Sequence, residues 1–479
     1  CGQFCKLPAS LFYGMNAWCT NRECFRLKGR HMIFRIFTGT RFVLSWLFPT
    51  THSELTSMAR RTEGIGLDRP SVCIVGIMLS ALHFFMVSLV YSRVPEPYMD
   101  EIFHLNQTRR YCNGDYSWNE KITTPPGTYI LAMSAFCGRE RWLNSVLWPL
   151  GFVGAIRFRR LFTQSQLTST AVLVMYLPVL MQSSLLFYTD LCSLITVLWA
   201  LSFSNALTSA LFFSFSVLTR QTNIVWAAAY GIYHLFRQID PHCSKVIYVT
   251  IVSSLLRLSP LALLGGAFVL FFILNDYSIV LGDHSAHHPT AHFMQLYYLL
   301  VFMCFSAAPY MLLSGNVLRA VRTFLCRPLR SLMWCVCITL CVYAFTMDHP
   351  YLLADNRHFT FYIWRWWFHR HWACKYILVP LYVIAAEAIA QSISHVARSV
   401  VIIYVVATAA VLVPARLLEP RYFIIPFVLW RLSVREKRFG IVVLELIYQV
   451  CVNSLVLYLF LDKPFEWVTE PGVKQRFMW

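Results

Sequence analysis

Long apolar runs separated by short polar loops occupy most of the chain between residues 71 and 460. The first run, 71–91, is long enough to cross a bilayer, because about 20 apolar residues span the hydrocarbon core. Further runs lie at 142–156, 167–187, 191–205, 207–219, 222–236, 258–275, 292–315, 331–347, 375–393, 399–416, 421–431 and 441–460. This pattern predicts an all-α polytopic membrane protein with about 11–14 transmembrane helices.

One apolar stretch, TPPGTYILAMSAF (124–136), is too short to cross the bilayer and is predicted to be re-entrant or interfacial. Its two prolines, Pro125 and Pro126, suit the first turn of a helix. If the stretch does not cross, the arginines of RFRR (157–160) fall on the cytoplasmic side, where membrane proteins carry their excess of positive charge. We therefore expect both of its ends on the opposite side of the membrane.

Basic residues give the predicted orientation of the whole chain. Arginines precede the first run, and basic loops cover 237–245 and 319–330, so these segments are expected in the cytoplasm. The opposite face receives the mixed polar stretches YMDEIFH (98–104), YTD (188–190), RQTN (220–223), GDHSAHH (282–288), the loop 348–365 and LLEPRYF (417–423). A transporter places its ionisable residues within spans near the midplane. Ionisable residues at span ends favour instead a site at the membrane surface.

Composition agrees with the membrane assignment and excludes one class of partner. Of the 479 residues, 57% are apolar and 13% are charged, whereas soluble domains carry about 25% charged residues. The formal net charge is +18. Because most arginines fall in short loops and form no continuous basic stripe, nucleic acid is not an expected partner.

Residues 1–70 form a separate and atypical part, in which cysteine, arginine and aromatic residues mix without steady periodicity. We expect either a cytoplasmic extension or the product of a gene-model error or a fragment, with Met58 as a candidate start. The short apolar piece FVLSWLF (42–48) could belong to a targeting peptide or an interfacial helix. The four N-terminal cysteines fit no common zinc spacing, and we predict neither a metal site nor a disulfide framework there.

The stretch YMDEIFH carries three ionisable groups just beyond the first apolar run. Asp100 and His104 share one face if the stretch is helical, while Glu101 points about 100° away. A carboxylate near apolar surface has a raised pKa and can act as a general base. The alternative is a solvated helix start, where acidic residues interact favourably with the helix dipole.

The loop ADNRHFTFY (354–362) sets Asp355, Asn356, Arg357 and His358 among aromatic residues. Arginine binds phosphate well, and histidine can also donate a hydrogen bond. The alternative is an interfacial loop whose arginine extends toward water.

Two other polar stretches have weaker chemical meaning by themselves. The histidines of GDHSAHH could bind a metal together with Asp283, but closed metal sites usually draw on separated segments, so we predict no metal. RQTN either belongs to a site or only caps a helix end.

Eight motifs occur in the order that characterises one enzyme family. They are YMDEIFH, RRYCNGDYS (109–117), ITTPPGTY (122–129), RQTNIVWA (220–227), GDHSAHH, LLADNRHFTFYIW (352–364), LLEPRYF and QRFMW (475–479). Over residues 71–479 the chain resembles the dolichyl-phosphate-glucose-dependent alpha-1,2-glucosyltransferases. The resemblance implies a GT-C-like glycosyltransferase of the endoplasmic reticulum membrane, with a luminal first loop and a luminal active site. The connection CGRERW (137–142) is shorter than is usual in that family.

The resemblance also implies a reaction. Members of the family add the third and last glucose to Glc(2)Man(9)GlcNAc(2)-PP-dolichol, the lipid-linked oligosaccharide of protein N-glycosylation. The donor is the β-linked dolichyl-phosphate-glucose and the new bond is alpha-1,2, so the anomeric centre inverts. The expected partners are these two lipid-linked substrates and membrane lipid, and no cofactor is expected to be obligatory.

Residue roles follow from the same resemblance. Asp100 is expected to be the general base, Glu101 the alternative base, and His104 a group that orients the base or the acceptor. The substrate-binding residues are expected in the other motifs: Arg220, Gln221, Asn223, Asp283, His287, Asp355, Asn356, Arg357, His358, Glu419 and Arg421. Two other hypotheses stay open, a polytopic transporter or channel-associated protein and a catalytically inactive scaffold.

Overall fold

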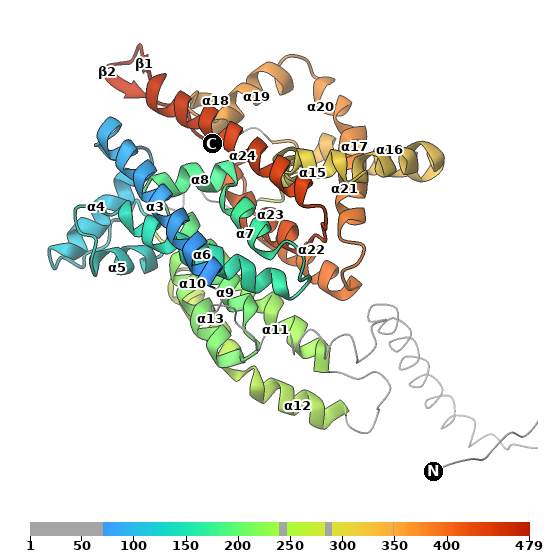
Figure 1. The fold of residues 1–479 in the computed structure, drawn as a ribbon, viewed down its shortest axis with the longest axis horizontal. Coiled ribbons are helices and arrows are strands. Elements are labelled where there is room, and N and C mark those ends of the chain that lie inside the picture. Colours follow the sequence, from blue (N-terminus) through green and yellow to red (C-terminus); the bar gives the residue numbers. More distant parts are fainter. Residues whose placement is uncertain (1–69, 239–246, 283–289, 348) are drawn as a thin grey trace, which may run out of the picture. The chain divides into compact units, whose positions relative to one another are not determined.

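The computed structural model describes residues 70–238, 247–282, 290–347 and 349–479, and Figure 1 shows their ribbon. Nearly every element in these ranges is a helix, and the sheet they contain is one antiparallel hairpin. The prediction of an all-α polytopic membrane protein is therefore confirmed. The predicted N-terminal part, 1–70, lies outside the described residues except for Pro70.

Each predicted apolar run forms a helix. The first half contains α3 (Pro70–Arg93), α4 (Glu101–Cys112), α5 (Gly127–Met133), α6 (Trp142–Arg160), α7 (Leu167–Met175), α8 (Pro178–Leu185), α9 (Asp190–Ser202), α10 (Ala206–Thr219), the 3-10 turn η2 (Gln221–Asn223), α11 (Ile224–Gln238), α12 (Ile247–Arg257) and α13 (Ser259–Leu274). The second half contains α14 (Met294–Ser306), α15 (Ala308–Leu313), α16 (Asn316–Cys326), α17 (Pro328–Phe345), α18 (Pro350–Ala354), α19 (Phe359–Ile363), the π-helical turn η3 (Trp364–Phe368), α20 (Cys374–Ile377), α21 (Val379–Ser392), α22 (Arg398–Leu412), the 3-10 turn η4 (Pro420–Phe423), α23 (Ile424–Ser433) and α24 (Phe439–Asp462). The strands are β1 (Phe465–Trp467) and β2 (Glu470–Gln475).

Several helices are long and apolar enough to cross a membrane. Among the described residues these are α3, α17, the segment Cys374–Ser392 and α24, and the pair α7–α8 is one further candidate that is bent by 60°. Pro178 begins α8. Proline cannot continue the hydrogen-bonding of a helix and disfavours helical geometry at the residue before it, so the run 167–187 breaks there. Other apolar helices have 10–17 residues, and the number of crossings stays a prediction.

The packing core is built around α9. This helix packs against α6 and α10, and almost all of its residues are buried. The first helix, α3, packs against α6. The helix α13 is apolar along its length yet buries none of its residues, as expected for a helix that faces lipid.

The short apolar stretch 124–136 does not form a helix long enough to span a membrane. Its helical part, α5, has only 7 residues. A disulfide joins Cys112 at the end of α4 to Cys137 after α5, and Arg141 donates a hydrogen bond of 2.6 Å to Glu101 in α4. The segment after the stretch therefore lies beside α4, as expected if the stretch does not cross the membrane, and the side on which its ends lie stays a prediction. This disulfide was not predicted.

Gly127 sets how closely α5 approaches the end of α10. A Cβ atom at this position would lie 2.6 Å from the backbone oxygen of Leu218, so no larger residue fits without a backbone shift. Because α10 ends at Thr219, the contact positions the RQTN stretch against the loop before α5. A hydrogen bond of 2.9 Å from the Gln221 side chain to the Thr123 carbonyl joins the same two segments.

Candidate active site

A cavity of about 930 Å³ lies where the predicted polar stretches converge. Its wall includes the start of α4, the loop before α5, the start of α9, the η2 turn, the loop before α19 and the residues around η4. These segments are far apart in the sequence, and the pattern of apolar runs predicts that all of them lie on one membrane face. Apolar side chains also line the cavity, among them Phe268, Phe272, Val411, Leu417, Leu418 and Ile425.

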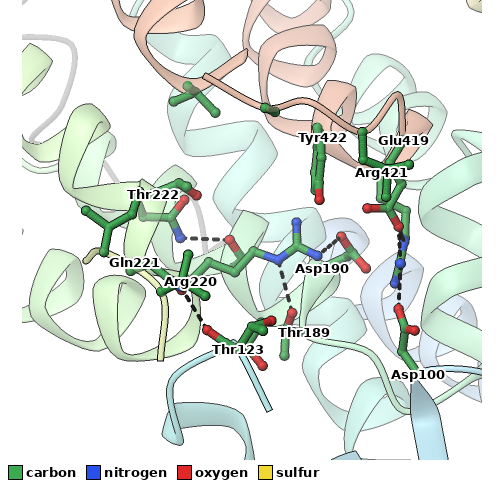
Figure 2. Close-up of a pocket in the computed structure, with 18 of the residues that line it drawn as sticks. Asp100, Thr123, Thr189, Asp190, Arg220, Gln221, Thr222, Glu419, Arg421 and Tyr422 are labelled. Carbon is green, nitrogen blue, oxygen red and sulfur yellow. Dashed lines mark hydrogen bonds and ion pairs between the residues drawn. The ribbon is translucent and has the colours of Figure 1, made fainter. Parts of the chain in front are cut away.

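Asp100 lies at the N-terminal end of α4 and faces the cavity. Arg421 donates a hydrogen bond of 2.7 Å to its carboxylate and also bonds to Glu419 (Figure 2). Burial tends to raise the pKa of Asp100, but the charge and hydrogen bond of Arg421 outweigh it, so the net pKa is lowered. The prediction of a raised pKa is wrong in direction, because a cation sits on this carboxylate. Asp100 is ionised at neutral pH and able to accept a proton.

Glu101, the neighbouring acid, points away from the cavity and does not line it. Its carboxylate is fully buried and accepts hydrogen bonds from Arg141 at 2.6 and 2.7 Å. The backbone N–H groups of Tyr98 and Phe187 donate to it as well, at 3.1 and 2.8 Å. A carboxylate with four donors and no access to the cavity holds α4 in place. This arrangement favours a positioning role over the predicted catalytic one.

His104 lines the cavity one turn beyond Asp100. Its Nδ1 lies 2.7 Å from the Tyr129 hydroxyl. Burial lowers the pKa of His104 to about 4, with Arg421 and Arg220 acting in the same direction and Asp100 against it. His104 is therefore neutral at physiological pH, and it can orient a hydroxyl group but does not add positive charge.

The RQTN stretch supplies a second charged pair. Arg220 follows α10 in an extended conformation, and its Nη2 lies 2.8 Å from Asp190 while its Nε donates to the Thr189 hydroxyl at 3.0 Å (Figure 2). Gln221 lines the cavity beside it. Asn223 also contacts the cavity, but its side-chain amide donates to Ser193 and Ser216, so it mainly joins α9 to α10.

The loop before α19 brings Asp355, Arg357 and His358 to the cavity wall. Asp355 accepts hydrogen bonds from the Arg357 side chain at 2.8 and 2.7 Å. Burial tends to raise the pKa of Asp355, but these bonds lower it overall. Arg357 also donates to Gln475 at 3.1 Å. Asn356 does not line the cavity, because its side-chain oxygen accepts a hydrogen bond from Trp467.

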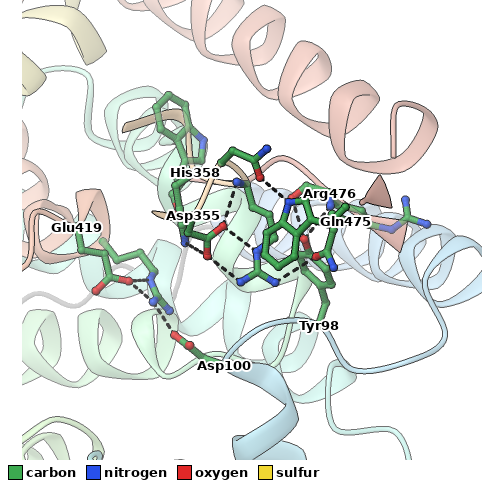
Figure 3. Close-up of polar contacts among 12 residues, drawn as sticks. Tyr98, Asp100, Asp355, His358, Glu419, Gln475 and Arg476 are labelled. Atoms are coloured by element: carbon green, nitrogen blue, oxygen red, sulfur yellow. Dashed lines mark hydrogen bonds and ion pairs between the residues drawn. The ribbon is translucent and has the colours of Figure 1, made fainter. Parts of the chain in front are cut away.

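The C-terminal segment 475–479 holds this loop and the start of α4 together (Figure 3). The Arg357 and Met478 backbones are linked by a hydrogen bond of 2.9 Å, and the His358 ring lies 2.9 Å from the Trp479 carbonyl. On the other side, the Tyr98 hydroxyl donates to the Arg476 carbonyl and accepts from its N–H, at 2.9 and 2.7 Å. Hydrogen bonds therefore join segments from three parts of the chain behind the cavity-lining residues Asp100, Arg357 and His358.

Charges in the described wall are balanced. The carboxylates are Asp100, Asp190, Asp355 and Glu419, and the basic side chains are Lys121, Arg220, Arg357 and Arg421. Each arginine is paired with at least one carboxylate. An incoming phosphate must therefore compete with a carboxylate for an arginine. A wall that carries both paired charges and apolar side chains suits a substrate that joins a sugar phosphate to a lipid chain.

Most of the predicted site residues come together in this cavity. Those that line it are Asp100, His104, Arg220, Gln221, Asn223, Asp355, Arg357, His358, Glu419 and Arg421. Glu101 and Asn356 do not, and Asp283 and His287 lie outside the described residues. Sequence reasoning missed Asp190, although YTD was recognised as a polar stretch on this face. It also missed Arg141, which comes from the short connection CGRERW.

A helical membrane protein whose cavity carries both paired charges and apolar side chains has the architecture of an enzyme that acts on a lipid-borne substrate. Comparison with known sequences is more specific, because the DIE2/ALG10 family matches residues 94–432. The chain belongs to the DIE2/ALG10 family.

Relatives from distant organisms cover most of the chain. A Mus musculus protein is 33% identical over 464 residues, with 80% of this chain and 93% of the relative covered. A Homo sapiens protein is 31% identical, with 80% and 93% covered, and an Arabidopsis thaliana protein is 33% identical, with 81% and 95% covered. All three are named Dol-P-Glc:Glc(2)Man(9)GlcNAc(2)-PP-Dol alpha-1,2-glucosyltransferase. No solved structure matches the chain. The predicted family is confirmed. The comparisons also support the prediction of a glucosyltransferase over the alternative of a transporter.

Proposed function

We propose that this chain transfers the third glucose from dolichyl-phosphate-glucose to Glc(2)Man(9)GlcNAc(2)-PP-dolichol, in alpha-1,2 linkage and with inversion. The observation that carries the proposal is Asp100, an ionised carboxylate that lines the cavity and is bonded to Arg421. Glycosyl transfer from a phosphate needs a base for the acceptor hydroxyl and a cation for the leaving phosphate, and these two residues can supply both. The names of the relatives supply the two substrates.

The reaction is a single displacement. The acceptor hydroxyl attacks the anomeric carbon, the bond from that carbon to the phosphate oxygen breaks, and the hydroxyl proton passes to Asp100. Attack opposite the β-linked phosphate yields the alpha bond. Arg421 stabilises the charge that develops on dolichyl phosphate.

The ion pair between Asp100 and Arg421 couples donor binding to base strength. In the resting site Arg421 lowers the pKa of Asp100 and so weakens it as a base. A phosphate that takes up hydrogen bonds from Arg421 removes that influence, and Asp100 becomes more basic when the donor is in place. Arg357 is a second candidate for the phosphate, and its hydrogen bonds go to Asp355 and Gln475 in the resting site.

Neither a metal ion nor a cofactor takes part in the proposed reaction. Dolichyl phosphate is a good leaving group, and the arginine supplies the positive charge that a metal would otherwise provide. Membrane lipid surrounds the apolar helices, and both substrates enter through their lipid portions.

The proposed location is the endoplasmic reticulum membrane, with the active site on the luminal side. The disulfide between Cys112 and Cys137 supports this side, because disulfides persist in oxidising compartments and are rare in the cytosol. It joins α4, which begins beside Asp100, to the segment after α5.

The test is glucose transfer by the purified full-length protein from dolichyl-phosphate-glucose to the diglucosylated acceptor. The wild type should add one glucose, and Asp100→Asn should be slower by about 10²–10⁴-fold, the usual contribution of a general base. The variant should remain folded, because Arg421 keeps Glu419 as a partner.

Asp115→Asn is the matched control. Asp115 follows α4, is exposed and does not line the cavity, so its variant should have wild-type activity. Near-normal transfer by Asp100→Asn would exclude the proposed base, and the absence of transfer by the wild type would exclude the proposed function.

A further inference from the structure

Asp190 is a buried carboxylate on the cavity wall to which no role has been given above. It is the first residue of α9, and only 3% of it is exposed. Arg220 Nη2 lies 2.8 Å from its Oδ1, but within the described residues neither carboxylate oxygen has a partner with hydrogen-bond geometry. Buried carboxylates usually accept several hydrogen bonds. Asp190 therefore has acceptor capacity available for a bound molecule.

Arg220 is held in a fixed position beside this carboxylate. Its Nε donates to the Thr189 hydroxyl at 3.0 Å, and the residue itself follows directly after α10. Figure 2 shows Asp190 between Arg220 and the Arg421–Asp100 pair. A carboxylate acceptor and a planar donor thus lie together on the wall of the cavity that also contains the proposed base.

The groups around this pair include the charged side chains of Arg421, Glu419 and Asp100 and several neutral polar ones. Thr123, Thr189, Gln221 and Thr222 line the same part of the cavity. A phosphate is unsuited to this part, because the negative charge of Asp190 repels it. A sugar suits it, because hydroxyl groups donate to a carboxylate and accept from a guanidinium group or an amide.

We infer that Asp190 and Arg220 bind hydroxyl groups of one of the two glucose residues, either the one being transferred or the terminal glucose of the acceptor. The inference rests on the proposed function and assigns the sugar-binding part of the same cavity. Asp190 is then a substrate-binding residue and takes no proton in the reaction, which is the role of Asp100.

The experiment combines Asp190→Asn with substrates that lack single hydroxyl groups. Dolichyl-phosphate-glucose analogues with one hydroxyl replaced by hydrogen probe the donor, and acceptors modified in the same way on their terminal glucose probe the acceptor. The asparagine keeps the shape and one acceptor oxygen but loses the charge. With unmodified substrates, it should raise the KM for one substrate by about 10- to 100-fold, the value of a hydrogen bond to a charged group.

The decisive result is the coupling between the variant and one particular hydroxyl. In the wild type, removal of that hydroxyl should raise KM to a similar degree, and in Asp190→Asn its removal should add little. If the coupling is found with a donor analogue, Asp190 and Arg220 bind the transferred glucose. If it is found with an acceptor analogue, they bind the terminal glucose of the acceptor. A purely structural role would slow all substrates alike.

Arg220→Lys provides a second route if Asp190→Asn does not fold, because lysine keeps a positive charge beside Asp190 but loses the planar donor. It should show the same coupling to one hydroxyl. The inference would be overturned if, for every analogue, the change in KM from the variant and the change in KM from the missing hydroxyl simply added in free energy. If the wild type transfers glucose while no coupling is found, the inference fails and the proposed function stands.

Discussion

Replacing Glu101 by glutamine should destabilise the protein without removing a catalytic group. Glu101 and Arg141 form an ion pair in which both side chains are almost completely buried. Each oxygen of this carboxylate accepts two hydrogen bonds. Oε1 accepts from Arg141 Nε and the Phe187 N–H, and Oε2 accepts from Arg141 Nη2 and the Tyr98 N–H. Whichever way the glutamine is oriented, its NH₂ group faces two donors.

The magnitude follows from these contacts in two ways. Two buried donors without an acceptor cost about 1–3 kcal/mol each, or about 2–6 kcal/mol together. Breaking a buried ion pair by removing one partner costs about 3–5 kcal/mol. The two values overlap, so we expect the free energy of unfolding to fall by about 3–5 kcal/mol. That loss is a large fraction of a typical protein's stability, which is about 5–15 kcal/mol.

The assay compares thermal unfolding of purified Glu101→Gln, Arg141→Gln and the double variant. Each single variant leaves one buried charge without its partner. The double variant removes both charges and should be more stable than the sum of the two losses predicts. The molecules of Glu101→Gln that remain folded should transfer glucose with a KM close to the wild-type value, because Glu101 does not line the cavity.

Wild-type stability combined with lost turnover in Glu101→Gln would refute this reasoning. Glu101 would then take part in the chemistry, and the roles assigned to the two acids would have to be exchanged. Asp100→Asn provides the contrast, because we expect it to lose turnover and keep its stability.

Three further predictions concern how the cavity is held together. Gly127→Ala should lower the melting temperature and raise KM, because a Cβ 2.6 Å from the Leu218 carbonyl pushes α5 away from the RQTN stretch, at a cost of about 1–3 kcal/mol; an unchanged melting temperature would contradict it. Tyr98→Phe should lower the free energy of unfolding by about 1–3 kcal/mol and reduce glucose transfer, because the Tyr98 hydroxyl bonds to both the carbonyl and the N–H of Arg476. Tyr116 is exposed, so Tyr116→Phe should have no effect in the same unfolding and transfer assays. Replacing Cys112 and Cys137 by serine should lower stability by about 2–5 kcal/mol; peptide mapping of the non-reduced protein should find the linked pair, and free thiols at both positions would exclude it.

Regular patterns in the sequence were enough to predict the helices and the shared face of the polar stretches. Each apolar run forms a helix, because a chain in lipid must satisfy its backbone hydrogen bonds within the segment. The shortness of TPPGTYILAMSAF was a sufficient reason to predict that it does not cross. The ordered motifs identified the family, which the comparisons confirm.

Tertiary structure decided which charged groups pair with one another. Asp100 and Glu101 are adjacent and chemically similar, but α4 turns one toward the cavity and the other toward Arg141. The direction of the pKa shift of Asp100 depends on Arg421, a residue more than 300 positions away in the sequence. No local pattern contains that information, because ion pairs depend on distances in space.

The same reason explains what was missed at the site. Asp190 looked like any polar residue at a helix start until the fold buried it beside Arg220. The terminal QRFMW was recognised as a motif, but its contacts with Tyr98 and with the loop before α19 appear only once the chain has folded back. The sequence by itself determined the elements and the family. The tertiary structure alone decided which acid faces the substrate and which one holds the helix.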